Sequence, residues 1–258
     1  MLRFASILLL ASLLIPSQRP NTSPVRRAEA SVLRDAVLVT WYGNPRTGVT
    51  IKKVLPAYQL VAVVATCTEG ADKRWRRRET ADVIQALLDD AHAHGFKLIL
   101  DIQPGRSTVA DEVAALRPFL SDPDVYLALD PEFAMTGCEI PGQHIGQMAA
   151  ADINAALTAL EDIIAKGHLP PKVLILHQFR LDMLPDKGAI QPSPSVDVVL
   201  NMDGFGSQAL KQASYATVMK QGALEFAGIK LFYKQDTALF TPAQVMKFSP
   251  QPSVIIYQ

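Results

Sequence analysis

The chain has 258 residues, of which 25 are basic and 25 acidic, so its formal net charge is zero. A chain without net charge generates no long-range field, and charge alone therefore does not favour binding to nucleic acid or to an anionic membrane surface. Hydrophobic residues make up 49% of the sequence, which is enough for a large buried core.

The N-terminal residues are typical of a secretory signal. Arg3 precedes an apolar stretch, Phe4–Ile15, that is too short to span a bilayer comfortably as a mature helix. The next residues, up to 30, are polar and contain proline, and Ala28-Glu29-Ala30 is one candidate cleavage site. We therefore expect a signal peptide and linker over 1–30, a single domain over 31–258, and a secreted or extracytoplasmic protein. An uncleaved membrane anchor is the alternative.

Eight short apolar runs predict β-strands along the rest of the chain. They are Val37–Thr40, Leu60–Ala65, Leu98–Leu100, Tyr126–Leu129, Val173–Leu176, Val196–Leu200, Ile229–Phe232 and Val254–Ile256. Apolar periodicity and capping residues predict helices at Thr80–His94, from Ser107-Thr108 to Pro118, and at Met148–Lys166, Gln208–Lys220 and Thr241–Lys247.

Strands that alternate with helices in this way are most easily closed as an α/β barrel of the (β/α)8, or TIM-like, type. Such a barrel commonly needs about 250 residues and sometimes only about 200, so one barrel accounts for 31–258. Glycines and prolines between Tyr42 and Tyr58 leave little room for a helix, so we expect a reduced first βα unit. No helix is expected after the eighth strand.

The active site of a TIM-like barrel lies where the C-terminal ends of its strands meet, and the sharpest motif there is Asp130-Pro131-Glu132. Two carboxylates that are two residues apart at a strand end project to the same side of the sheet. The proline between them removes a hydrogen-bond donor where strand pairing stops. The motif predicts that Glu132 is a general acid whose pKa is set by Asp130. The alternative is that Asp130 only accepts backbone hydrogen bonds that fix the loops.

Other carboxylates follow neighbouring strands. Either Asp101 or Asp203 could be the second catalytic carboxylate of a glycosidase, acting as a nucleophile or as the base that activates water. A divalent cation is the alternative, with ligands drawn from Asp101, Asp130, Glu132, Asp203 and His177. No compact metal-binding spacing supports that alternative, so we assign no metal ligand.

Polar and aromatic side chains at the same strand ends are predicted to bind substrate. His177 is suited to orient a carboxylate or to hydrogen-bond a substrate hydroxyl, and aromatic rings commonly stack on sugars. The predicted binding set is His177, Gln178, Gln103, Trp41, Tyr42, Tyr233, Asp236 and Tyr257.

Two further features leave alternatives open. Cys67 and Cys138 both fall on the predicted catalytic face, and an exported protein meets oxidising conditions, so a disulfide and two free thiols are both compatible with the sequence. The run Lys73-Arg74-Trp75-Arg76-Arg77-Arg78 predicts either a contact with an anionic glycan or a solvated basic face.

Four segments carry a resemblance to a known group of proteins. At Leu98–Ser107, Val125–Phe133, Lys172–Phe179 and Asn201–Gly206 the chain resembles exported bacterial proteins of unknown function with a glycosidase-like barrel. The Asp130-x-Glu132 ending is also similar to the acidic motif of barrel glycosidases such as the chitinase-like and muramidase-like families. The longer Asp-x-x-Asp-x-Asp-x-Glu run of the chitinase-like family is absent, because Val125 and Ala128 stand at two of its acidic positions, which argues against substrate-assisted catalysis.

The sequence thus predicts an exported glycoside hydrolase-like protein that acts on a polysaccharide or cell-wall glycan. Glu132 is the predicted acid, Asp130 its partner, and Asp203 or Asp101 the second carboxylate. A non-catalytic carbohydrate-binding barrel and a metal-dependent hydrolase are the alternatives. There is no G-x-S-x-G elbow, Walker motif or dinucleotide fingerprint, so we expect no cofactor, no nucleic acid partner, and no membrane contact other than an uncleaved anchor.

Overall fold

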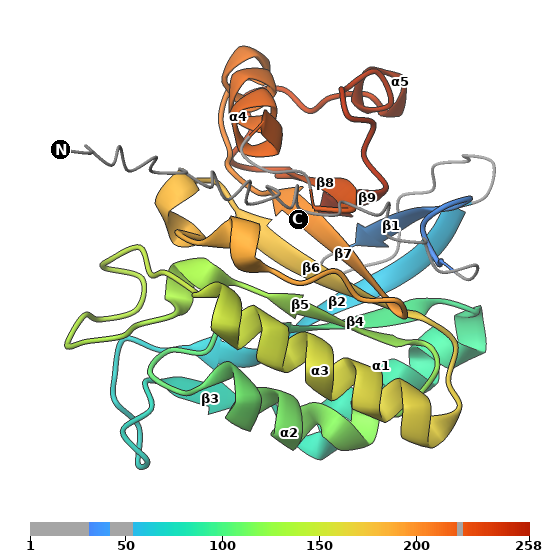
Figure 1. Ribbon diagram of the computed structural model, residues 1–258. Coiled ribbons are helices and arrows are strands. Elements are labelled where there is room, and N and C mark those ends of the chain that lie inside the picture. The colour runs from blue at the N-terminus through green and yellow to red at the C-terminus, as the bar shows by residue number, and fades with distance from the viewer. Residues whose placement is uncertain (1–30, 42–53, 221–223) are drawn as a thin grey trace, which may run out of the picture.

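A computed structural model describes residues 31–41, 54–220 and 224–258. Eight parallel strands form a closed barrel with helices between them, which confirms the predicted α/β, TIM-like architecture (Figure 1). The barrel strands are β1 (Val37–Trp41), β2 (Val54–Ala65), β4 (Lys97–Ile102), β5 (Val125–Leu129), β6 (Lys172–Gln178), β7 (Val196–Met202), β8 (Phe226–Leu231) and β9 (Val254–Tyr257). Pairing of β1 with both β2 and β9 closes the ring.

Strand β2 differs most from its predicted bounds. It begins at Val54 rather than at Leu60, because the residues from Val54 to Tyr58 pair with the whole of β1. Its far end pairs with a short antiparallel strand, β3 (Arg76–Arg78), outside the ring. Two predicted features lie outside the described residues. They are the reduced first βα unit, between β1 and β2, and the signal peptide and linker over 1–30.

The helices agree with the predicted pattern. They are α1 (Ala81–His94), α2 (Val109–Leu120), α3 (Ala150–Gly167), α4 (Gln208–Lys220) and α5 (Pro242–Val245). Thr80 and Thr108 cap α1 and α2, and Gly95 ends α1 in the left-handed conformation. Pro118 does not end α2 as predicted, because the helix continues for two more residues, Phe119 and the buried Leu120.

Three short 3-10 helices complete the connections: η1 (Pro131–Phe133), η2 (Leu181–Met183) and η3 (Lys187–Ala189). Helices α1, α2 and α3 cover one side of the barrel, and α4 and α5 lie on the opposite side (Figure 1). None of the helices in these described ranges is long and apolar enough to cross a membrane.

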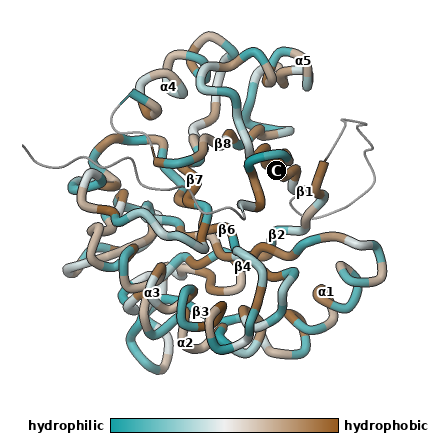
Figure 2. The backbone as a smooth tube through the Cα atoms, turned by 45° about the vertical axis from the view of Figure 1, so that its right-hand side comes forward, coloured by the Kyte–Doolittle hydropathy of each residue, from teal (hydrophilic) through white to brown (hydrophobic). Residues whose placement is uncertain are grey.

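The barrel interior is filled by alternate side chains of the strands, as period-two geometry requires. Its N-terminal half is apolar and is formed by Leu38, Ala57, Ile99, Ala128, Ile175, Val199 and Ile256 among others. Leu33, which precedes β1, packs into the same cluster, and its N–H donates to Asp197 Oδ2 at 2.9 Å. The strands are largely hydrophobic along the backbone trace, whereas hydrophobic and hydrophilic residues alternate along the helices (Figure 2).

Candidate active site

The C-terminal half of the barrel interior is polar. The alternation that buries Ile99 and Ile175 inside the barrel also directs Asp101 and His177 inward, each two residues further along its strand. Asp203 follows β7 directly, and Asp130 follows β5. A cavity of about 450 Å³ opens at this end, and its lining includes all four predicted catalytic carboxylates, those of Asp101, Asp130, Glu132 and Asp203.

His177 lies beneath the cavity and bridges two of these carboxylates. Its Nε2 is 3.4 Å from Asp101 Oδ2, and its Nδ1 is 3.4 Å from Asp203 Oδ2. Burial opposes a charge on the ring, but the two aspartates outweigh it and raise the pKa of His177 to about 10. His177 is therefore an imidazolium at neutral pH, with both nitrogens protonated.

Asp101 is the deepest of the four carboxylates. Its Oδ2 also accepts a hydrogen bond from Gln59 Nε2 at 2.8 Å. Burial alone would raise the pKa of Asp101, yet the charge of His177 and its hydrogen bond hold that pKa below the usual range. Asp101 is thus ionised and is engaged within the barrel by both His177 and Gln59.

Glu132 stands at the mouth of the cavity, on η1. Its backbone position is fixed because Gly146 N–H donates to Glu132 O at 2.6 Å. The side chain is half-buried, and burial together with the charge of Asp203 raises the pKa of Glu132 to about 7. Its carboxyl group is therefore close to half protonated at neutral pH, which is the state that a general acid needs.

Asp130 lies one layer deeper than Glu132 and is almost fully buried. Its Oδ2 accepts a hydrogen bond from Gln103 Nε2 at 3.3 Å, and the amide oxygen of Gln103 in turn accepts from Ala65 N–H at 3.2 Å. Burial and the charges of Asp101 and Asp203 raise the pKa of Asp130 well above its usual value. Its surroundings therefore oppose ionisation of Asp130, and Gln103, a predicted binding residue, holds the side chain in place at the cavity wall.

Each of the three aspartates has one oxygen without a hydrogen-bond partner among the described residues. These buried atoms are Asp101 Oδ1, Asp130 Oδ1 and Asp203 Oδ1. Unpartnered buried polar atoms are rare in folded proteins and are costly. Three of them around one cavity indicate a place where a polar ligand supplies the missing hydrogen bonds.

Lys230 also lines the cavity, and sequence reasoning missed it. Lys230 lies within the apolar run of β8, and such a run by itself predicts a strand residue rather than a site residue. Its charge lowers the pKa of both Asp101 and Glu132. Lys230 and Phe232 are two residues apart, so strand alternation directs both toward the cavity. This period-two spacing is the sequence feature from which Lys230 could have been predicted.

The aromatic side of the cavity differs from the predicted one. Phe133, Phe179, Phe205 and Phe232 line it, and the rings of Phe205 and Phe232 meet edge to face at 5.8 Å. Tyr233 and Tyr257 instead stack on each other at 5.9 Å, and neither is among the described residues that line the cavity. Of the two remaining predicted aromatics, Tyr42 and the side chain of Trp41 lie outside the described residues.

Two predicted binding residues have structural contacts instead. Gln178 follows inward-facing His177 and so points out of the barrel, where it donates to the carbonyl oxygens of Arg180 and Leu181. Asp236 accepts from Gly206 N–H and Phe232 N–H and forms a buried ion pair with Lys211 at 3.1 Å. Both side chains fix loops around the mouth and are absent from the cavity lining that the described residues form.

The basic run is also engaged within the fold. Arg76 and Arg78, in β3, both bind the buried carboxylate of Glu112 in α2, at 2.8 and 2.6 Å. Arg77 pairs with Glu79 at 2.7 Å. These three arginines therefore have carboxylate partners, and the run holds β3 against α2.

Cys67 and Cys138 are both free and exposed, which decides between the two alternatives that the sequence left open. Backbone hydrogen bonds from Thr66 to Trp75, from Arg106 to Arg74 and from Met135 to Gly105 place other chain segments between the loops that carry the two thiols. The two thiols therefore lie on separate loops and form no disulfide in this structure.

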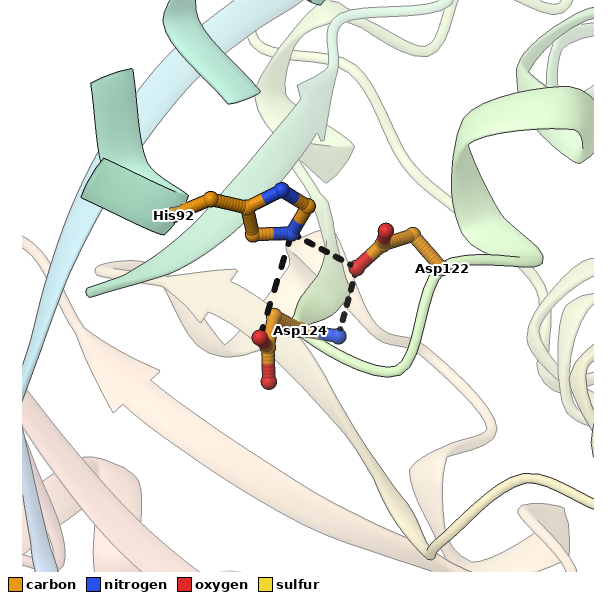
Figure 3. A group of neighbouring side chains, drawn as sticks. All are labelled: His92, Asp122 and Asp124. Carbon is orange, nitrogen blue, oxygen red and sulfur yellow. Dashed lines mark hydrogen bonds and ion pairs between the residues drawn. The ribbon is translucent and has the colours of Figure 1, made fainter. Parts of the chain in front are cut away.

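The predicted cation site in the cavity has little support in the geometry. The two nitrogens of His177 face Asp101 and Asp203 at 3.4 Å, so the imidazole already contacts two of the carboxylates that would share a cation with it. Among the described residues, the one group of three whose ligand atoms all lie within 4.8 Å of one another is elsewhere: His92, Asp122 and Asp124 (Figure 3). It is near the opposite end of the barrel, where Lys97 already pairs with Asp124, and it carries no metal assignment.

Comparison with known proteins adds no further constraint. No protein-family model matches the chain, and a search of curated proteins finds no match.

Proposed function

We propose that the protein is an exported glycoside hydrolase that cleaves a carbohydrate polymer or oligosaccharide by carboxylate acid/base catalysis. The observation that carries the proposal is the pairing of Glu132, whose pKa is raised to about 7, with Asp203 on the wall of the same cavity. A protonated carboxyl beside an ionised one is the arrangement that glycoside hydrolysis needs. Resemblance of four segments to exported proteins with glycosidase-like barrels supports the same class.

In this mechanism Glu132 donates its proton to the glycosidic oxygen as the bond from that oxygen to the anomeric carbon breaks. Asp203 supplies the second carboxylate, either as the nucleophile at the anomeric carbon or as the base that removes a proton from the attacking water. We assign this role to Asp203 rather than to Asp101, because Asp101 Oδ2 is held by both Gln59 and His177. His177 is the positioning residue that fixes Asp203.

Asp130 and Gln103 support the acid in the proposed mechanism. The raised pKa of Asp130 opposes a second negative charge beneath Glu132, which favours the carboxylate that Glu132 becomes after proton transfer. Its unpartnered Oδ1 and that of Asp203 are available for hydroxyl groups of the sugar. The aromatic rings on the other side of the cavity provide the faces on which sugars stack.

The decisive experiment uses Glu132→Gln with Glu69→Gln as the matched control, because Glu69 is an exposed glutamate in the loop after β2. Release of reducing ends is measured on a panel of polysaccharides, cell-wall glycans and oligosaccharides. We expect turnover of at least one glycan by the wild type and by Glu69→Gln, and a loss of about 100-fold or more in Glu132→Gln. Unchanged turnover in Glu132→Gln would refute the acid assignment.

The same panel separates the alternatives. Glycan binding without turnover in either the wild type or Glu132→Gln would replace the proposal by a non-catalytic carbohydrate-binding barrel. Turnover that a chelator abolishes and that added divalent cation restores would replace it by a metal-dependent hydrolase. Turnover that resists the chelator and requires Glu132 supports acid/base catalysis.

A further inference from the structure

A second, smaller cavity adjoins the candidate active site. It has a volume of about 180 Å³ and lies between the chain that follows β6 and helix α4. Its lining is Phe179, Leu181, Ala213, Ser214, Thr217 and Val218. Phe179 and Ser214 also line the larger cavity, so the two cavities are adjacent. We call the smaller cavity the α4 groove.

The α4 groove and the carboxylates have opposite chemistry. The carboxylates follow β4, β5 and β7, whereas the groove is formed by aliphatic and aromatic side chains with two hydroxyl groups and no charged residue among its described lining. Between the two regions, Phe205 and Leu210 line the larger cavity while remaining 61% and 55% exposed.

Large apolar side chains this exposed are costly to hydrate, and a cluster of them beside a concave site indicates a ligand-binding surface. Phe205 and Leu210 line the larger cavity together with Phe179, and Phe179 also lines the groove beside Leu181. A bound sugar chain would leave most of its hydroxyl groups without hydrogen-bond partners along these apolar side chains.

We propose that the α4 groove binds an apolar aglycone, so that the substrate is a glycan or sugar attached to an alkyl-like chain rather than an unmodified polysaccharide. This inference rests on the proposed glycoside hydrolysis. The sugar lies against the carboxylates, and the leaving-group oxygen lies at Glu132. The apolar chain passes Phe179 and Leu210 and is buried against α4.

Two alanines of α4 provide matched variants. Ala213 and Ala216 are both exposed on this helix, but only Ala213 lines the groove. Ala213→Trp fills the groove, whereas Ala216→Trp adds the same side chain to the same helix at a position outside the groove. Circular dichroism spectra and unfolding midpoints of both variants establish that they fold.

Binding is measured by isothermal titration to the full chain carrying Glu132→Gln, so that turnover is not needed. The probes are methyl and octyl β-glycosides of glucose, galactose, mannose and N-acetylglucosamine, each below its micellar concentration. We expect at least one octyl glycoside to bind about ten-fold or more tightly than its methyl counterpart, for which about two buried methylene groups suffice. Ala213→Trp is expected to reduce this preference to within about two-fold, and Ala216→Trp to retain it.

Any of three results would overturn the inference. They are equal binding of octyl and methyl glycosides for all four sugars, the absence of binding by any octyl probe, and a chain-length preference that survives Ala213→Trp. These outcomes are independent of the glycan turnover assay. Turnover that requires Glu132, without any chain-length preference, leaves the hydrolase proposal intact and removes the apolar aglycone. A chain-length preference that depends on position 213, in a protein that turns over no glycoside, supports the groove as an apolar binding site and removes the hydrolase proposal.

Discussion

Replacement of His177 by glutamine tests whether a buried imidazolium holds the base of the site together. The rise of the His177 pKa from 6.5 to about 10 corresponds to about 5 kcal/mol at 1.36 kcal/mol for each pH unit. Removing one partner of a buried ion pair typically lowers the free energy of unfolding by about 3–5 kcal/mol. We therefore expect His177→Gln to lower the free energy of unfolding by about 3–5 kcal/mol at pH 6.

The pH dependence gives the sharper test. Because the folded-state pKa of His177 is raised, its contribution is fully present below the unfolded value near 6.5 and is lost as pH rises toward about 10. The difference between wild type and variant should therefore be largest at pH 6 and shrink steadily toward pH 10.

Urea unfolding at intervals between pH 6 and pH 10 measures this difference, and His144→Gln, at an exposed histidine, is the control. A difference below about 1 kcal/mol at pH 6, where a cost of about 3–5 kcal/mol is expected, would refute the reasoning. So would a difference that does not change with pH.

Four further results are expected. Wild-type turnover should fall as pH rises through about 7, since Glu132 must be protonated; a pH–rate profile that is flat from pH 6 to 8 would contradict this. Lys230→Met should move that fall to higher pH because it removes a charge that lowers the pKa of Glu132, whereas exposed Lys234→Met should not. Glu112→Ala should destabilise the fold by about 2–4 kcal/mol at pH 7. This loss should shrink as pH falls below 4.5, because the arginines lower the pKa of Glu112 despite its burial, and an equal loss at pH 3 would contradict the expectation. Leu33→Ala should cost about 2–4 kcal/mol in urea unfolding if this residue closes the barrel, and a cost below about 1 kcal/mol would show that it does not.

The barrel was predictable because its strands are buried on both faces and therefore appear as short apolar runs. The same runs located Asp101, Asp130, Glu132 and Asp203, since a parallel barrel brings the C-terminal ends of its strands to one face. The start of β2 was not predictable in this way. Its first residues include Pro56, which indicates a break in the sequence but here lies opposite Val39 in the register with β1.

Strand alternation explains most of the differences between the predicted binding set and the residues that line the cavity. Gln178 was grouped with His177 because the two are neighbours at a strand end, yet adjacent residues of a strand face opposite sides. The same rule directs Lys230 inward two residues before Phe232, although both lie in a predicted apolar run. Asp236 lies outside the cavity lining for another reason: its partners Gly206 and Lys211 come from a loop and a helix remote in sequence.

Charge balance explains why Glu132, rather than one of the aspartates, is the proposed acid. Among the described residues at the cavity and directly beneath it, the cations of His177 and Lys230 stand against four carboxyl groups. His177 contacts Asp101 and Asp203, so these two are the carboxylates it compensates most directly. The other two, Asp130 and Glu132, are those whose pKa values are raised, and both raised values are traced to burial and to the charges of the first pair. Asp130 is enclosed, whereas Glu132 is half-buried at the mouth and can exchange its proton with a ligand or with water. A barrel that neutralises only half of its buried carboxyl groups therefore leaves one exchangeable proton at its entrance, and that proton is on Glu132.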